Sequence, residues 1–160
     1  MKLLYICRHA KSSWENLQTN DFDRPLNERG LSSAPLMASF FKGKEPNLDL
    51  IISSTALRAK ETANIYNVTL QVKMQEESSL YHIDYKELFH FICALPKDLN
   101  TVAIVGHNPG LTNIINYLSN ADLYNLPTAG IAAIQFEVGD WNEISADSGE
   151  LLWLKSPKEL

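Results

Sequence analysis

The sequence contains only two cysteines, Cys7 and Cys93, and neither a Cys-x-x-Cys pair nor a His-Glu-x-x-His motif is present. The usual spacings of protein zinc sites are therefore absent. No apolar stretch approaches the roughly 20 residues of a transmembrane helix. Lys2 is followed by only five apolar residues before Arg8, which is too few for a secretory signal. We expect a cytoplasmic protein with reduced thiols and with no metal, cofactor or membrane partner.

Positive charge is also scarce, since 14 Lys and Arg residues face 19 Asp and Glu residues and the net charge is −5. Nucleic acids and anionic membranes are normally bound by a basic face, so neither is an expected partner. Any anion must be bound by a local cluster of arginines. The 160 residues show no repeat, linker or low-complexity tract, and residues 1–160 are predicted to form a single domain.

Apolar runs alternate with helical patterns along the chain, which predicts an α/β fold with a mostly parallel central sheet and flanking helices. The predicted strands are 2–7, 48–53, 70–74, 101–105, 130–138 and 150–154. The predicted helices are 28–42 with Asn27 as its cap, 56–66 with Thr55 as its cap, 85–95 and 111–118.

Two histidines follow directly after apolar runs. His9 ends the first run behind Arg8, and His107 follows the run 101–105 through Gly106. In open α/β sheets, ligands bind at the carboxyl ends of strands. An arginine fork matches phosphate oxygens, and an adjacent imidazole can attack phosphorus. The alternatives are that Arg8 pairs with a carboxylate, that His9 is a capped loop residue, and that His107 caps the helix behind it.

Arg58 lies in the first turn of the predicted helix 56–66. Backbone N–H groups at a helix start favour an anion, and a cation there opposes the helix dipole unless an anion compensates. Its position therefore indicates anion binding. The alternative is a surface ion pair with Glu61 or Glu28.

Together these motifs resemble the histidine phosphatase superfamily. The resemblance rests on Arg8-His9-Ala10, on the Ser-x-x-Leu-Arg-Ala-x-Glu-Thr stretch around Arg58, and on Val105-Gly106-His107-Asn108. Segments 8–14, 23–30, 126–132 and 154–160 are similar to the SixA-like phosphohistidine phosphatase branch. The resemblance covers nearly the whole chain. It implies a three-layer α/β/α sandwich of the phosphoglycerate-mutase-like type.

The resemblance also implies residue roles. His9 would be the nucleophile that becomes phosphorylated. Arg8, Arg58 and His107 would complete the catalytic group by neutralising charge in the transition state. The side chains that would bind the phosphoryl group are Arg8, Arg58, His107, Arg24 and Ser12. For Arg24 the alternative is an ion pair with Asp21 or Asp23.

The chain departs from the superfamily pattern at several positions. Ala10 replaces the usual glycine after the histidine, and Glu15 replaces a phosphate-binding asparagine of mutase-like members. The carboxylate of Glu15 should repel a second phosphate. A general acid is hard to identify, and Glu76 and Glu77 are the candidates.

The substrate follows from this chemistry. An alkoxide leaving group usually needs a proton, whereas a phosphohistidine can release neutral imidazole. Mutase-like relatives are also longer and cover the pocket, so an open pocket is expected here. We expect a phosphoric-ester or phosphoramidate hydrolase that acts on a protein carrying phosphohistidine. The alternatives are a small-molecule phosphomonoesterase or mutase of the same superfamily, acting on a small phosphorylated substrate, and a non-catalytic phosphate sensor.

Overall fold

The computed structural model describes residues 1–160 and is built around a single six-stranded sheet with the order β3-β2-β4-β1-β5-β6. The strands are β1 (Lys2–Arg8), β2 (Leu50–Ser54), β3 (Met74–Glu77), β4 (Thr101–Gly106), β5 (Ile131–Phe136) and β6 (Gly149–Lys155). Strands β1 to β4 are mutually parallel, and β5 runs antiparallel to both β1 and β6. The predicted mostly parallel sheet is confirmed.

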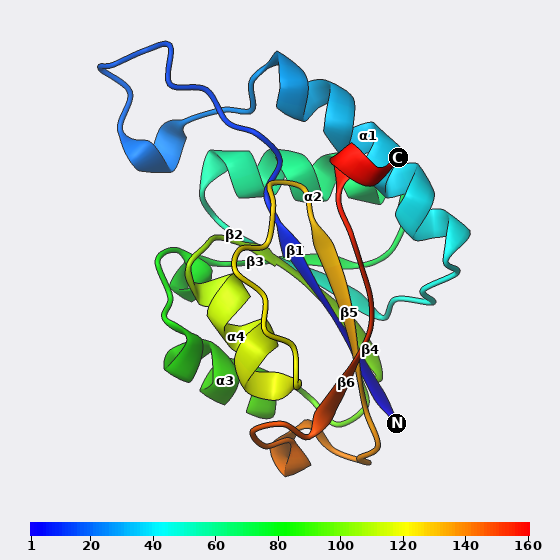
Figure 1. The fold of residues 1–160 in the computed structure, drawn as a ribbon. Helices are drawn as coiled ribbons and strands as arrows, with labels where there is room; N and C mark the ends of the chain where they lie inside the picture. Colours follow the sequence, from blue (N-terminus) through cyan, green and yellow to red (C-terminus); the bar gives the residue numbers. More distant parts are fainter.

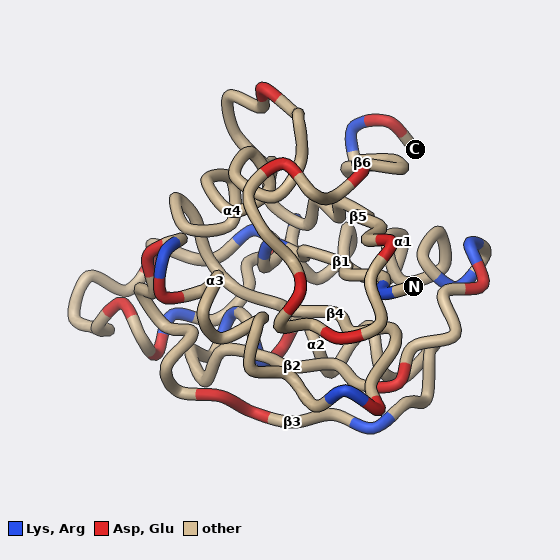
Figure 2. Tube along the Cα trace, turned by 90° about the horizontal axis from the view of Figure 1, so that it is seen from below, with Lys and Arg blue, Asp and Glu red and all other residues tan.

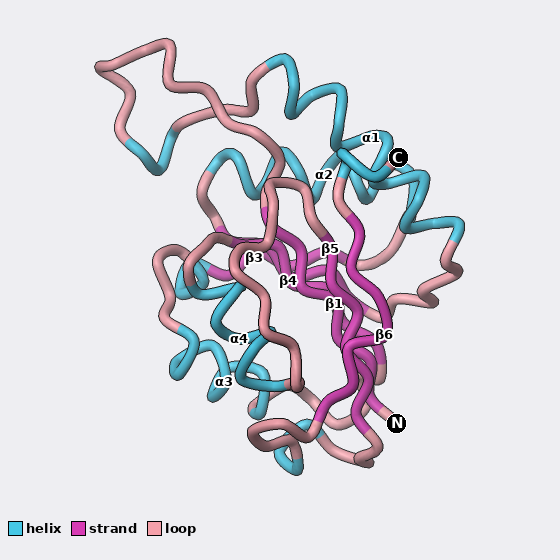
Figure 3. The backbone as a smooth tube through the Cα atoms, in the orientation of Figure 1, coloured by secondary structure: helices cyan, strands magenta, loops and turns pink.

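Helices cover both faces of the sheet, which makes three layers (Figure 1). They are α1 (Glu28–Gly43), α2 (Leu57–Leu70), α3 (Tyr85–Cys93) and α4 (Gly110–Leu118). Helices α1 and α2 lie on one face and α3 and α4 on the other, with the strands between them (Figure 3). Alternate residues of β1 point to opposite faces, so Leu4 and Ile6 join the core under α3 and α4. Tyr5 and Cys7 join the core under α1 and α2.

Both cysteines are free thiols, with Cys7 buried and Cys93 half-buried. None of the helices combines the length and the apolar character that crossing a bilayer requires.

Two local predictions are wrong, and both concern α2. The short strand predicted at 70–74 lies further along the chain, at Met74–Glu77, because α2 continues to Leu70 and ends at Gln71, whose left-handed backbone (φ 54°) stops the helix. Burial of Ala63 and Tyr66 against α1 outweighs the strand preference of the β-branched residues that follow. Thr55 does not cap α2; the N-cap is Ala56, whose N–H donates to Ser54 Oγ at 3.3 Å.

Gly30 holds the loop after β1 against the start of α1. Asn27 caps α1 as predicted by accepting from the Gly30 N–H at 2.9 Å, and its own N–H donates to the Lys11 carbonyl at 3.0 Å. A Cβ atom at position 30 would collide with that same carbonyl oxygen. The close approach therefore requires glycine and fixes the backbone of Lys11.

Replacing Gly30 by alanine is expected to lower the free energy of unfolding by about 1–3 kcal/mol, because rigid backbone must move. Gly43→Ala in the same helix is the matched control, since no atom lies within 4 Å of its added Cβ. That variant should gain up to ~1 kcal/mol from helix propensity. Urea denaturation measures both values, and equal stability of the two variants would contradict the packing argument.

Candidate active site

A polar hollow of about 470 Å³ lies at the carboxyl ends of β1 and β4. Six residues with predicted catalytic or phosphate-binding roles line this polar hollow. They are Arg8, His9, Ser12, Arg24, Arg58 and His107. The structure therefore gathers side chains that are up to 99 positions apart in the sequence.

Strand register explains the meeting of the two histidines. Parallel pairing aligns Arg8 with Gly106, so His9 and His107 leave the sheet at the same level. The His9 N–H donates to the Gly106 carbonyl at 3.1 Å, and the ring centroids are 5.3 Å apart. Strand β2 pairs with β4 on its other side, so α2, which follows β2, delivers Arg58 to the same hollow.

The His9 ring is held in one orientation. Its Nδ1 lies 2.7 Å from the Ala10 carbonyl, and because a carbonyl only accepts, Nδ1 carries the proton. Arg58 Nε donates to His9 Nε2 at 3.3 Å, so Nε2 carries no proton and its lone pair accepts this hydrogen bond. Burial, followed by the charges of Arg58 and Arg8, outweighs the Ala10 hydrogen bond and lowers the pKa of His9 to about 4.

His107 is also a neutral ring. Its Nε2 lies 2.8 Å from Ser54 Oγ, while its buried Nδ1 has no hydrogen-bond partner. Burial and the nearby His9 and Arg58 lower the pKa of His107 to about 3. The side chain of His107 does not cap α4; Asn108 Oδ1 accepts from the Thr112 N–H at 3.1 Å instead.

Arg8 has no carboxylate partner. Its Nη1 donates to the Leu126 carbonyl at 2.9 Å, and its buried Nε has no partner within the protein. Burial, together with the charge of Arg58, lowers its pKa, although a guanidinium remains protonated at neutral pH. Arg8 thus keeps donor capacity for a ligand.

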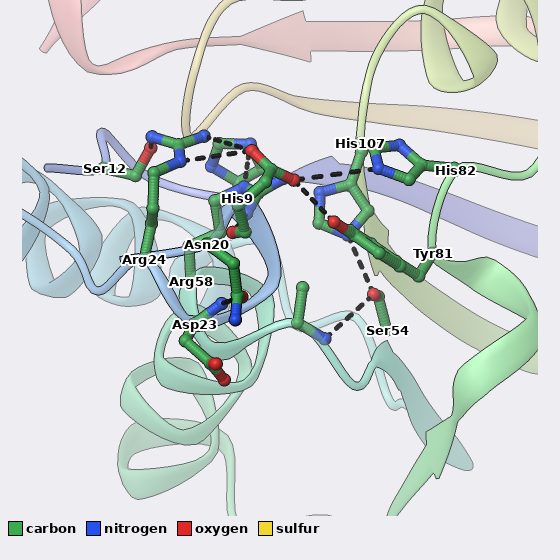
Figure 4. A network of polar contacts seen from close by, with 12 residues as sticks. His9, Ser12, Asn20, Asp23, Arg24, Ser54, Arg58, Tyr81, His82 and His107 are labelled. Carbon is green, nitrogen blue, oxygen red and sulfur yellow. Dashed lines mark hydrogen bonds and ion pairs between the residues drawn. The ribbon is translucent and has the colours of Figure 1, made fainter. Parts of the chain in front are cut away.

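Asp21 bridges two guanidinium groups and is the only acidic residue that lines the polar hollow. Its Oδ1 accepts from Arg24 Nε at 3.1 Å, and its Oδ2 accepts from Arg58 Nη2 at 3.0 Å and from the Tyr81 hydroxyl at 2.7 Å. Figure 4 shows Arg24, Arg58, Tyr81 and His9 in one network of polar contacts. The alternative partner considered for Arg24 is present, while Arg58 pairs with Asp21 and with neither Glu61 nor Glu28.

The Asp21 carboxylate stays ionised. Burial alone would raise its pKa, but hydrogen bonds from Tyr81 and Arg58 outweigh burial and hold the pKa well below its usual range. Sequence reasoning assigned no functional role to Asp21 or Tyr81. The i, i+3 spacing of Asp21 and Arg24 is a local signal for their ion pair. No sequence pattern predicts the hydrogen bond from Tyr81 to Asp21.

Ser12 and Trp14 support Arg24. Arg24 Nη1 donates to Ser12 Oγ at 2.7 Å, and its guanidinium carbon lies 3.5 Å from the centroid of the Trp14 ring. Stacking on an aromatic face and a side-chain hydrogen bond restrict the guanidinium. Ser12 therefore contacts Arg24 in this structure and lines the polar hollow beside it.

The predicted acid candidates Glu76 and Glu77 do not line the polar hollow. They lie on β3, the edge strand, where they pair with Ser53 and Ser54 of β2. Because β2 and β4 separate β3 from β1, these carboxylates sit away from His9. Glu76 instead forms an ion pair with Lys60 at 3.6 Å.

Glu15 and Ala10, the two departures from the family pattern, differ in their surroundings. Glu15 is exposed and does not line the polar hollow. Ala10 is fully buried, and its N–H donates to Thr62 Oγ1 at 2.9 Å.

No group of three or more His, Cys, Asp or Glu side chains is arranged to hold a metal ion. Neutral imidazoles and guanidinium groups suit a tetrahedral oxyanion.

The lowered pKa of His9 predicts that its ring stays neutral down to about pH 4, well below the ordinary value near 6.5. The unprotonated ring is therefore present across the neutral range and is lost only on stronger acidification. Nitrogen-15 NMR of the imidazole should show a proton on Nδ1 and a bare Nε2 at pH 6. Protonation of His9 at pH 6–7 would contradict this environment.

Comparison with known proteins identifies the family of this chain. The model of the histidine phosphatase superfamily (branch 1) matches residues 4–91. An uncharacterised chloroplast protein of Arabidopsis thaliana is 31% identical over 161 residues, which cover 94% of this chain and 73% of that protein.

Solved structures share the fold over almost the whole chain. A candidate phosphohistidine phosphatase SixA from Agrobacterium tumefaciens is 26% identical, with a TM-score of 0.84 over 98% of both chains. A protein histidine phosphatase SixA complexed with tungstate is 22% identical, with a TM-score of 0.82 over 98% of both chains. Since the family match covers more than half of the chain and the fold agrees from end to end, this chain belongs to the histidine phosphatase superfamily and is SixA-like.

Proposed function

We propose that this protein is a phosphatase in which His9 becomes transiently phosphorylated, and that its substrate is phosphohistidine on another protein. The observation that carries the proposal is the His9 ring. Its Nδ1–H is held by the Ala10 carbonyl, and its bare Nε2 faces Arg58 in the polar hollow. An oriented, unprotonated imidazole is the form that attacks phosphorus.

Positive charge and free donors would hold the phosphoryl group. Arg8 Nε and His107 Nδ1 are buried without partners. Arg8 Nε would donate to one phosphoryl oxygen. His107 Nδ1 would donate to another in the tautomer in which Ser54 donates to Nε2 and the ring proton is on Nδ1. Arg24 and Arg58 supply two further guanidinium groups to the same hollow. Such fixed cations stabilise the charge spread over the oxygens in phosphoryl transfer.

The reaction would proceed in two displacements. His9 Nε2 attacks phosphorus, the new N–P bond forms, and the bond to the substrate nitrogen breaks as its imidazole leaves. Water then attacks phosphorus, and the bond to Nε2 breaks with its electron pair returning to His9. The oxygen and both protons of water leave with the phosphoryl group as dihydrogen phosphate, which can release a proton to solvent. The lowered pKa of His9 favours release of a neutral ring at this second step.

Asp21 favours a nitrogen leaving group over an alkoxide. It is the only carboxyl group lining the polar hollow, and its lowered pKa keeps it ionised, so it has no proton to give at neutral pH. An alkyl phosphate needs that proton. A phosphohistidine whose ring already carries a second proton leaves as neutral imidazole, and exchange between two imidazoles is nearly balanced in energy.

The named relatives support this direction. The Agrobacterium tumefaciens structure is described as a candidate phosphohistidine phosphatase, and the tungstate complex belongs to a protein histidine phosphatase.

We further propose that residues 1–160 act as one domain, because strands of the sheet come from the whole length of the chain. Its free thiols suit the reducing cytoplasm.

Turnover of a phosphohistidine peptide, compared with the alkyl esters phosphoserine and glycerol 3-phosphate, tests the proposal. We expect a kcat/KM at least ~10-fold higher for the peptide, since the polar hollow offers these esters no protonated carboxyl group to protonate their alkoxide leaving groups. Faster hydrolysis of the phosphomonoesters would favour the small-molecule phosphatase. Binding without turnover of any substrate would favour the phosphate sensor.

A further inference from the structure

A small basic pocket of about 80 Å³ adjoins the polar hollow. Its cations are Lys11, Arg29 and Lys158, and no hydrophobic residue lines it. Lys11 and Thr128 line both this basic pocket and the polar hollow. An anion bound here would therefore sit next to a phosphoryl group at His9.

The basic pocket is assembled from fixed elements. The Lys11 backbone is held by the Asn27 N–H and by the close approach of Gly30. Arg29 lies in the first turn of α1, and Lys158 lies in η4 (Pro157–Glu159), which packs against α1 (Figure 1). A capping box between Ser156 and Glu159 holds η4 in place. The three cations are thus brought together by the fold.

None of these three cations has a counter-ion within the protein. The four ion pairs of the structure involve other residues, and no hydrogen bond uses the side-chain nitrogens of Lys11, Arg29 or Lys158. Arg29 also lies beside Glu28 in the first turn of α1, where the helix dipole disfavours a cation. An external anion would supply the counter-ion that these three cations lack.

Charge is divided unevenly over the molecule. Six of the 14 Lys and Arg residues line the polar hollow or the basic pocket, whereas only Asp21 among the 19 acidic residues does so. Figure 2 shows acidic residues spread over β3 and the loops elsewhere. An acidic protein with one basic face attracts and orients an acidic partner there.

We propose that the basic pocket binds an acidic side chain of the protein that carries the phosphohistidine. This inference rests on the proposed function and adds a specificity site to it. A carboxylate matches the small volume and the Lys and Arg donors. The pocket contains no histidine, cysteine or carboxylate, so it would bind and orient the substrate while His9 performs the chemistry.

Two peptides test the proposal, one with phosphohistidine flanked by Glu and one with Gln in the same positions. The native protein should show a kcat/KM about 10-fold higher for the Glu peptide, a preference that added salt reduces. The double variant Arg29→Gln/Lys158→Gln should lose this preference. Lys86→Gln, an exposed cation on α3, is the matched control and should keep it.

Free phosphohistidine separates this inference from the proposed function. Arg29 and Lys158 do not line the polar hollow, so the double variant should hydrolyse the free amino acid at the native rate, which also shows that it folds. Equal rates on the two peptides, or a preference that survives in the double variant, would overturn the basic pocket as a specificity site. Failure to hydrolyse any phosphohistidine substrate would overturn the proposed function itself.

Discussion

Replacing His9 by alanine should lower kcat/KM on a phosphohistidine peptide by on the order of 10⁴-fold, because the variant lacks the attacking nitrogen. The remaining cations can still bind the phosphoryl group, so KM should change much less than kcat. His90→Ala is the matched control, since His90 is exposed on α3 and lies outside the polar hollow. Steady-state release of phosphate measures both variants.

A labelled phosphodonor gives a second readout of the same variant. Rapid acid-free quenching should trap label on the native protein and on His90→Ala, and none on His9→Ala. Label on His9→Ala, or activity within 10-fold of the native protein, would mean that another group attacks phosphorus.

Arg58→Ala is expected to lower kcat by about 10³-fold, a typical loss when one fixed donor to transition-state charge is removed. The expected size reflects the position of the side chain. Arg58 contacts His9 Nε2 through its Nε and Asp21 through its Nη groups, so it supports the nucleophile and the anion site at once. Its loss should also raise the pKa of His9, which Arg58 helps to lower.

Two further variants separate charge from geometry. Arg58→Lys keeps the charge but not the planar fork, and it should recover only a small part of the activity. Lys60→Ala removes a cation from the same helix, where Lys60 pairs with Glu76, and should leave kcat unchanged. Full activity in Arg58→Lys would show that charge alone suffices and that the fork contacts are dispensable.

The central part of the site could be predicted because it follows from strand ends. His9 and His107 each follow a buried strand, and β1 and β4 proved to be parallel neighbours in register. Arg58 stands one residue inside α2, after the neighbouring strand β2. Where parallel strands are adjacent, the residues that follow their carboxyl ends meet at one edge of the sheet. Recognising the strands in the sequence is therefore enough to predict that these residues lie together.

The acidic residues of the site could not be predicted in the same way. Asp21 reaches the guanidinium groups from an irregular loop, through η1 (Asp21–Asp23), and no periodic pattern specifies where a loop returns. Glu76 and Glu77 were candidate acids because of their place in the sequence. The strand β3 begins at Met74, after α2 runs on to Leu70, and places them at the sheet edge.

Asp21 changes the electrostatic account of the site. A sequence with Arg8, Arg24 and Arg58 around one histidine indicates an anion site with strong mutual repulsion. In the structure, the Asp21 carboxylate joins Arg24 and Arg58 and so offsets part of that repulsion before any substrate binds. Preorganised cations of this kind need little rearrangement during the reaction.

The most direct test of the account is a crystal structure of the protein with vanadate, which mimics the phosphoryl group during transfer. We predict vanadium bonded to His9 Nε2, with its equatorial oxygens within hydrogen-bond distance of Arg8, Arg58 and His107. Vanadate bound elsewhere, or held in the polar hollow with His9 Nε2 turned away from vanadium, would contradict nucleophilic attack by His9.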